Sequence, residues 1–190
     1  MDNLFITFHA FLLLFIFLAG GVNKIANFQG TADFLETKVN ALELNPIFFA
    51  AVIIAILYFY VILISFGKLN QPNNIYLFLF ISVVLVGIPT LSYFKKLLNQ
   101  SKWLVSLVYN TAIAGVIGLL ALGSSLILYS LYTSKYEEYA YIATIGLAVF
   151  TAMTILIFHF PTNPSEVISF TKNLSIFGGL MLLSQRFVRL

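Results

Sequence analysis

The sequence contains no cysteine and few charged residues, and each shortage excludes a class of protein. Without cysteine, the chain forms no disulfide, no thiolate metal site and no cysteine nucleophile. Only 9% of the 190 residues are charged, whereas soluble domains have about 25%. With 61% hydrophobic residues and a mean hydropathy of +0.99, the chain has more apolar surface than a water-soluble fold can bury. We therefore expect an integral membrane protein that has the lipid bilayer as its main partner and binds no nucleic acid.

Six apolar runs are candidate membrane spans, although the first and the last are short, since a hydrocarbon core of about 30 Å takes about 20 residues per helix. The runs do not alternate as barrel strands would, and backbone groups left unpaired in lipid are costly, so we expect helices. The predicted fold is an all-α bundle of about six transmembrane helices in a single domain, residues 1–190. The predicted spans are residues 4–21, 46–66, 75–94, 104–131, 139–158 and 174–187.

Residues 31–44 differ from these runs because charged and apolar residues alternate there with a helical period. Gly30 and Thr31 are expected to start the helix. Glu36 and Lys38 should be exposed on its polar face. This pattern predicts an amphipathic helix that lies at the membrane interface. Its expected apolar stripe is Phe28, Ala32, Leu35, Val39 and Leu42.

The basic residues do not predict the orientation of the chain in the membrane. Cytoplasmic loops usually carry an excess of Lys and Arg. Here the basic residues divide almost evenly between the loops expected on the two sides.

Polar residues in or beside apolar helices are the candidates for function, because they are costly in a membrane. His9 lies early in the first span and His159 closes the fifth. Either could contact a quinone, but a histidine at a membrane boundary or helix end is a sufficient account of both. Lys24 and Lys172 could simply reach lipid phosphates. The sharper hypothesis is that Lys24, His159, Lys172 and Asn173 converge in one polar pocket for an anionic or quinone head group.

The sequence offers little for catalysis. No Asp or Glu lies inside a predicted span, and no phosphate-binding loop or nucleophile–base pair is visible. We therefore expect no independent catalytic activity and no metal. A quinone or a lipid is the expected ligand.

Small residues predict where helices approach closely in lipid. Gly118 belongs to a stripe with Ala114, Ala121 and Ser125 in the fourth span. In the last span, Gly178 and Gly179 are expected to let that helix press on the first, near Gly20 and Gly21.

Two segments resemble the DoxX-like family of small membrane proteins. Residues 17–28, FLAGGVNKIANF, are similar to the family's turn after the first helix. Residues 158–161, FHFP, and 170–183, FTKNLSIFGGLMLL, resemble its last two helices. Residues 111–128 resemble its glycine-rich second helix. The resemblance implies a four-helix core, into which residues 46–94 insert an extra pair.

The sequence departs from the family's pattern in two places. His9 stands where relatives often carry Arg, and Thr111 and Ala112 stand where an acidic residue is common.

The resemblance suggests two functions of different classes. Some relatives are subunits or partners of quinone-linked redox enzymes, which implies an auxiliary or anchoring subunit in a prokaryotic cytoplasmic (inner) membrane. Longer relatives are surfeit-locus cargo receptors, which implies a non-enzymatic cargo receptor, assembly factor or transporter-like binding protein. The first interpretation predicts a lipid-accessible pocket lined by His9, His159 and aromatic rings. The second predicts an exposed loop surface or partner groove, with residues 31–44 as the contact.

Overall fold

A computed structural model describes residues 2–41, 101–159, 161 and 164–187. The chain divides into two compact units, residues 1–36 with 106–190, and residues 37–105. Of the second unit, only residues 37–41 and 101–105 are described. The predicted pair of spans at 46–66 and 75–94 therefore lies outside the described residues.

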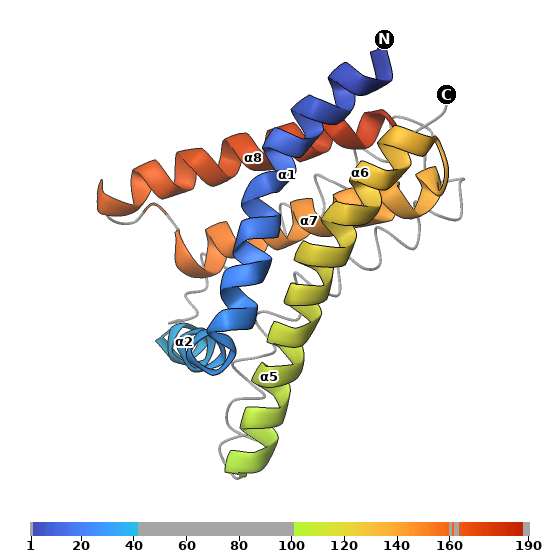
Figure 1. The fold of residues 1–190 in the computed structure, drawn as a ribbon. Helices are drawn as coiled ribbons and strands as arrows, with labels where there is room; N and C mark the ends of the chain where they lie inside the picture. The colour runs from blue at the N-terminus through green and yellow to red at the C-terminus, as the bar shows by residue number, and fades with distance from the viewer. Residues whose placement is uncertain (1, 42–100, 160, 162–163, 188–190) are drawn as a thin grey trace, which may run out of the picture. The chain divides into compact units, whose positions relative to one another are not determined.

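Nearly all described residues are helical, and no strand occurs among them, as the apolar runs predict (Figure 1). The elements are α1 (Asp2–Ala26), α2 (Phe28–Ala41), α5 (Lys102–Gly118), the π-helical turn η2 (Leu119–Gly123), α6 (Ser124–Thr133), α7 (Glu137–Phe158), the 3-10 turn η3 (Pro164–Glu166) and α8 (Val167–Gln185).

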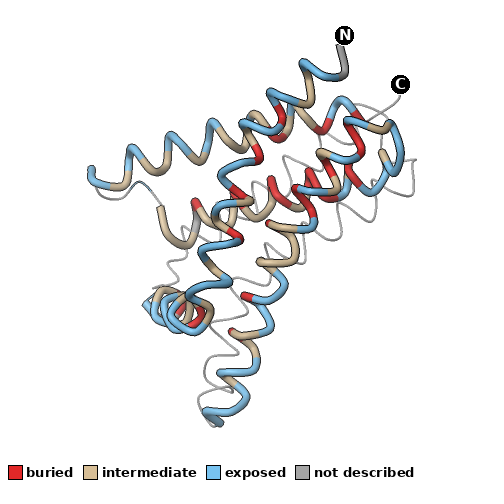
Figure 2. The backbone as a smooth tube through the Cα atoms, viewed as in Figure 1, coloured by how far each residue is buried: buried red, intermediate tan, exposed pale blue. Residues whose placement is uncertain are grey.

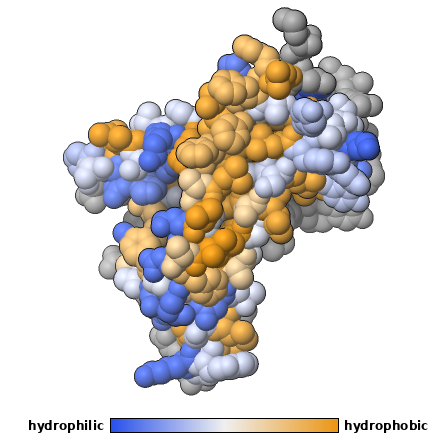
Figure 3. Space-filling model, viewed as in Figure 1, coloured by the Kyte–Doolittle hydropathy of each residue, from blue (hydrophilic) through white to orange (hydrophobic). Residues whose placement is uncertain are grey.

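Four helices within the described residues are long and apolar enough to cross a membrane. They confirm the first, fourth, fifth and sixth predicted spans, and each contains apolar side chains that face away from the protein. Leu182 is 77% exposed, for example, which suits a side chain in contact with lipid. Figure 3 shows apolar side chains covering most of the visible face of α1. The four helices are Leu4–Ala26, Lys102–Thr133, Glu137–Ile155 and Pro164–Gln185.

The second of these helices is the longest because α5, η2 and α6 run on without a break. Its 32 residues are about 48 Å long at 1.5 Å per residue, which exceeds a hydrocarbon core of about 30 Å. Aromatic side chains are exposed at both ends, Trp103 at one and Tyr129 and Tyr132 at the other. Trp and Tyr favour the interface between lipid and water, so the helix has anchors at both ends.

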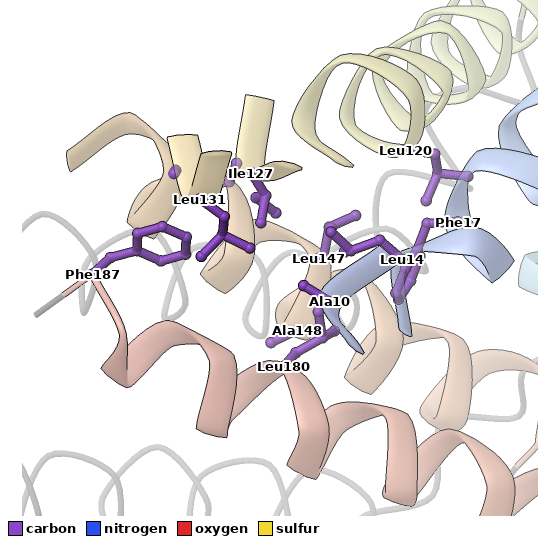
Figure 4. Close-up of a cluster of buried hydrophobic side chains, with 12 residues drawn as sticks. Ala10, Leu14, Phe17, Leu120, Ile127, Leu131, Leu147, Ala148, Leu180 and Phe187 are labelled. Atoms are coloured by element: carbon purple, nitrogen blue, oxygen red, sulfur yellow. The ribbon is translucent and has the colours of Figure 1, made fainter. Parts of the chain in front are cut away.

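The core lies where α1, α6, α7 and α8 meet, and Figure 2 shows the buried positions gathered on their facing sides. Leu14 of α1, Leu147 of α7 and Leu180 of α8 are fully buried, and Figure 4 shows Leu14 beside Leu147, with Leu180 next to Ala10 and Ala148. Lipid is as apolar as leucine, so close van der Waals packing has to hold these helices together.

Glycines set two close approaches of α1, and one of them differs from the prediction. A Cβ at Gly21 would lie 3.4 Å from the Leu120 Cβ, so α1 rests directly on η2. A Cβ at Gly179 would lie 3.2 Å from Leu13 Cδ1, so α8 does press on α1. That contact lies about two turns before Gly20 and Gly21, the expected place, because α8 crosses α1 there.

The other two predicted packing glycines have no such contact. A Cβ at Gly178 or at Gly118 would have no described neighbour within 4 Å. The predicted small-residue stripe therefore makes contact only in part. Of its members, Ala121 faces Gly21, whereas Ala114 and Ser125 are exposed.

The predicted amphipathic helix forms as α2, but it starts at Phe28 instead of Gly30 and Thr31. The Asn27 carbonyl accepts hydrogen bonds from both the Thr31 backbone N–H (3.0 Å) and the Thr31 hydroxyl (2.7 Å), so the first turn is already helical. Figure 1 shows α2 end-on while α1 lies across the view, so the chain turns sharply at Asn27. That turn suits a helix lying along a membrane surface, which remains a prediction.

The two faces of α2 differ from the prediction in one respect. Ala32 and Val39 of the apolar stripe are buried, as expected. Glu36 and Lys38, expected to be exposed, are half-buried. Both have long apolar stems, and a long stem can be partly buried while its charged end stays in water.

Candidate functional site

A pocket of about 200 Å³ opens between α1, α7 and α8. The two outer helices cross at Leu13 and Gly179, and Figure 1 shows them diverging from that crossing toward the end of α1 and the start of α8. α7 forms the wall of the pocket between these two diverging helices, and η2 contributes one side chain. The pocket is lined by Ile16, Phe17, Gly20, Lys24, Leu120, Phe150, Thr151, Thr154, Asn173 and Ile176.

The lining changes from apolar to polar along α1. Near the crossing it consists of large apolar side chains, among them the buried Phe17 and Leu120 that Figure 4 shows together. Lys24 lies in the last turn of α1, Thr154 one turn before the end of α7, and Asn173 in the second turn of α8. The polar end of the pocket is therefore at the end of the bundle where α1 and α7 finish and α8 begins.

This arrangement places the loops after the first and fifth spans at the same end of the bundle. Lys24, which precedes the first of these loops, and Asn173, which follows the second, both line the pocket. In addition, the ring of Phe34 in α2 stacks on that of Phe158, with centroids 5.6 Å apart and planes at 15°. Of the four residues predicted to converge, two therefore share one pocket.

Lys24 and Asn173 have hydrogen-bonding capacity that no described residue uses. Lys24 is half-buried, and within the described part of the chain its ammonium group makes no ion pair and no hydrogen bond. The Asn173 side-chain amide also has no partner among described residues. An ammonium offers three donors, and an amide offers two donors and an acceptor. The polar end of the pocket is thus rich in donors and positively charged.

The two threonines have already used their donors. The Thr151 hydroxyl donates to the Leu147 carbonyl at 2.8 Å, and the Thr154 hydroxyl donates to the Phe150 carbonyl at 2.9 Å. Threonine hydroxyls in helices commonly bond back to their own backbone in this way. Each hydroxyl has one hydrogen and two lone pairs, so only acceptor capacity remains for a ligand. Because back-bonding explained both threonines, sequence reasoning did not include them in the site.

Leu120 is a second lining residue that the sequence did not indicate. It belongs to η2, and π-helical turns are rare and often occur at functional sites. The turn lies against Gly21 of α1, which brings Leu120 to the pocket wall. No residue pattern marks a π-helical turn, so no signal in the sequence indicates Leu120 as a lining residue.

His159 and Lys172 do not line the pocket, although both were predicted to. His159 Nδ1 lies 2.8 Å from Glu166 Oε2, so the imidazole is engaged across the loop between α7 and α8. Lys172 is exposed. The prediction placed Lys172 and Asn173 at the start of a helix. α8 instead begins at Val167, so successive residues point to different sides of its second turn.

His9 lies at the other end of α1. It is 15 residues from Lys24, or about 22 Å along the helix. Its Nδ1 lies 2.8 Å from the Phe5 carbonyl of its own helix, and its ring lies 4.2 Å from the Phe5 ring. The side chain is exposed, as expected for a histidine at a membrane boundary.

Within the described residues, no group of three or more His, Cys, Asp or Glu side chains could hold a metal ion. The chemistry that the pocket offers is hydrogen bonding and one positive charge, which suits binding more than bond cleavage. Comparisons with known protein families, with curated proteins and with solved structures find no match.

Proposed function

We propose that this protein is an auxiliary or anchoring membrane subunit that binds the polar head group of an amphipathic molecule and has no catalytic activity of its own. The observation that carries the proposal is the pocket between α1, α7 and α8, with apolar side chains at one end and Lys24 and Asn173 at the other. At about 200 Å³ the pocket is smaller than the roughly 300–1,000 Å³ of typical ligand sites, so it suits a head group better than a whole molecule.

The resemblance to the DoxX-like family supports a setting for this subunit. It suggests a quinone-linked redox complex in a prokaryotic inner membrane. A quinone has an apolar ring with carbonyl acceptors, which could receive hydrogen bonds from Lys24 and Asn173. A membrane lipid is the other amphipathic molecule with an oxygen-bearing head group in that setting.

Copurification from native membranes tests the role as a subunit. The full chain, tagged and extracted in a mild detergent after brief crosslinking, should retain a redox enzyme such as a flavoprotein or a thiol-handling enzyme. Varied client proteins, retained in a way that depends on α2, would instead support the cargo receptor, assembly factor or transporter-like alternative. Recovery of the chain with no partner at all would refute the subunit role.

A further inference from the structure

We infer that the pocket selects an anionic lipid head group that also carries a free hydroxyl, as a glycerol phosphodiester does, in preference to a neutral quinone ring. The inference rests on the proposed function, because it names the ligand of the same pocket. It follows from comparing the hydrogen-bonding groups of the pocket with those of each ligand.

The charge of Lys24 favours an anionic ligand. The half-buried Lys24 ammonium has no counter-ion among the described residues, and no Asp or Glu lines the pocket. A charge partly removed from water is costly unless it is paired. A phosphodiester supplies the opposite charge and accepts charge-assisted hydrogen bonds from Lys24 and Asn173. A quinone carbonyl accepts a hydrogen bond but leaves the charge uncompensated.

The hydrogen-bond acceptors that line the pocket favour a ligand with a hydroxyl group. Thr151 and Thr154 have given their hydroxyl hydrogens to backbone carbonyls, so they present only lone pairs. An oxidised quinone has only acceptors to set against them. A hydroxyl on the head group is a donor, and it can satisfy Thr154 at the half-buried end of the pocket.

The apolar end of the pocket favours a lipid over a soluble head group. Ile16, Phe17 and Phe150 continue the pocket away from Lys24 along α1 and α7. A free phosphate or glycerol phosphate would leave these side chains uncovered, whereas the first carbons of an acyl chain would cover them. The source of the head group is therefore a lipid.

Native mass spectrometry of the full chain in detergent tests the inference with four lipid probes and one quinone. Phosphatidylglycerol carries charge and hydroxyl, phosphatidylmethanol carries charge alone, and phosphatidylcholine and a short-chain ubiquinone carry no net charge. Phosphatidic acid, with a phosphomonoester, tests whether charge alone decides. We expect phosphatidylglycerol to be retained about tenfold better than phosphatidylcholine or the quinone. It should exceed phosphatidylmethanol by about two- to tenfold, as one hydrogen bond allows.

Three variants assign the effect to the pocket. Lys24→Met should abolish the preference for anionic lipids. Thr154→Val should abolish only the preference for phosphatidylglycerol over phosphatidylmethanol. Lys172→Gln is the matched control, because it removes a charge from an exposed residue next to Asn173 that does not line the pocket, and should change neither preference. Helix content by circular dichroism and elution volume show whether Lys24→Met folds, and an Asn173→Leu variant takes its place if it does not.

The outcomes separate the inference from the proposed function. Equal retention of phosphatidylcholine and phosphatidylglycerol, or equal losses in Lys24→Met and Lys172→Gln, would overturn the inference. Displacement of the lipid by soluble glycerol phosphate as readily as by phosphatidylglycerol would overturn the lipid source. Lys24-dependent binding of ubiquinone alone would overturn the head-group class and leave the proposed function standing. Failure to retain any lipid or quinone would refute both the inference and the proposed function.

Discussion

Replacing Gly21 with leucine should destabilise the bundle far more than the same change at Gly178. A Cβ at Gly21 would lie 3.4 Å from the Leu120 Cβ and 3.7 Å from the Ala121 backbone N. A Cβ alone fits at those distances, but the further carbons of leucine would enter space that the η2 backbone occupies. Overpacking costs about 1–3 kcal/mol, and a backbone neighbour favours the upper part of that range because it cannot rotate away.

The measurement is thermal unfolding in detergent, followed by size-exclusion chromatography with fluorescence detection. For a chain of this size, about 2–3 kcal/mol corresponds to a transition lowered by about 5–10 °C. Gly178 is the matched control, since it is exposed and a Cβ there would have no described neighbour within 4 Å. Gly21→Ala should be nearly neutral. If Gly21→Leu unfolds at the same temperature as Gly178→Leu, α1 does not rest on η2 as described.

Three further predictions concern other parts of the first unit. Cysteine introduced at Ala32 should resist labelling while its neighbours in α2 react with a helical period, and uniform labelling would contradict the amphipathic helix. His159→Ala and Glu166→Gln should each cost less than about 1 kcal/mol, because both side chains are about a third exposed. The double variant should cost no more than either single one, and additive losses would show that the two side chains do not act as a pair. Leu147→Ala should cost about 2–5 kcal/mol in the same thermal assay, whereas Leu182→Ala on the exposed face should cost little, and similar losses would contradict the assigned core.

The spans could be predicted from sequence because lipid imposes one strong requirement, a long apolar helix. The sides of those helices could not, since lipid and protein interior accept the same residue types. Leu14 is fully buried and Leu12 is 57% exposed, yet nothing in their chemistry distinguishes them. In a soluble helix the exposed position would be polar, and the pattern would have identified the buried face.

Two of the four residues predicted to share a polar pocket line it, and the absence of His159 from its lining has a local cause. Lys24 and Asn173 line the same pocket because Lys24 precedes one loop and Asn173 follows another loop at the same end of the bundle. His159 was expected there too, but Glu166 engages it from seven residues further along. That contact depends on how η3 places the carboxylate, and the sequence pattern does not determine such geometry.

The helix Lys102–Thr133 couples the bundle to the thickness of the bilayer. Its 32 residues exceed what an upright helix needs, and hydrophobic mismatch of this kind is relieved by tilt or by local thickening of the bilayer. Aromatic side chains at both ends oppose sliding through the membrane, so tilt is the freer response. α1 must follow, because Gly21 lies directly against η2. In a thinner membrane we therefore expect the helix Lys102–Thr133 and α1 to tilt as a pair and to stay in contact.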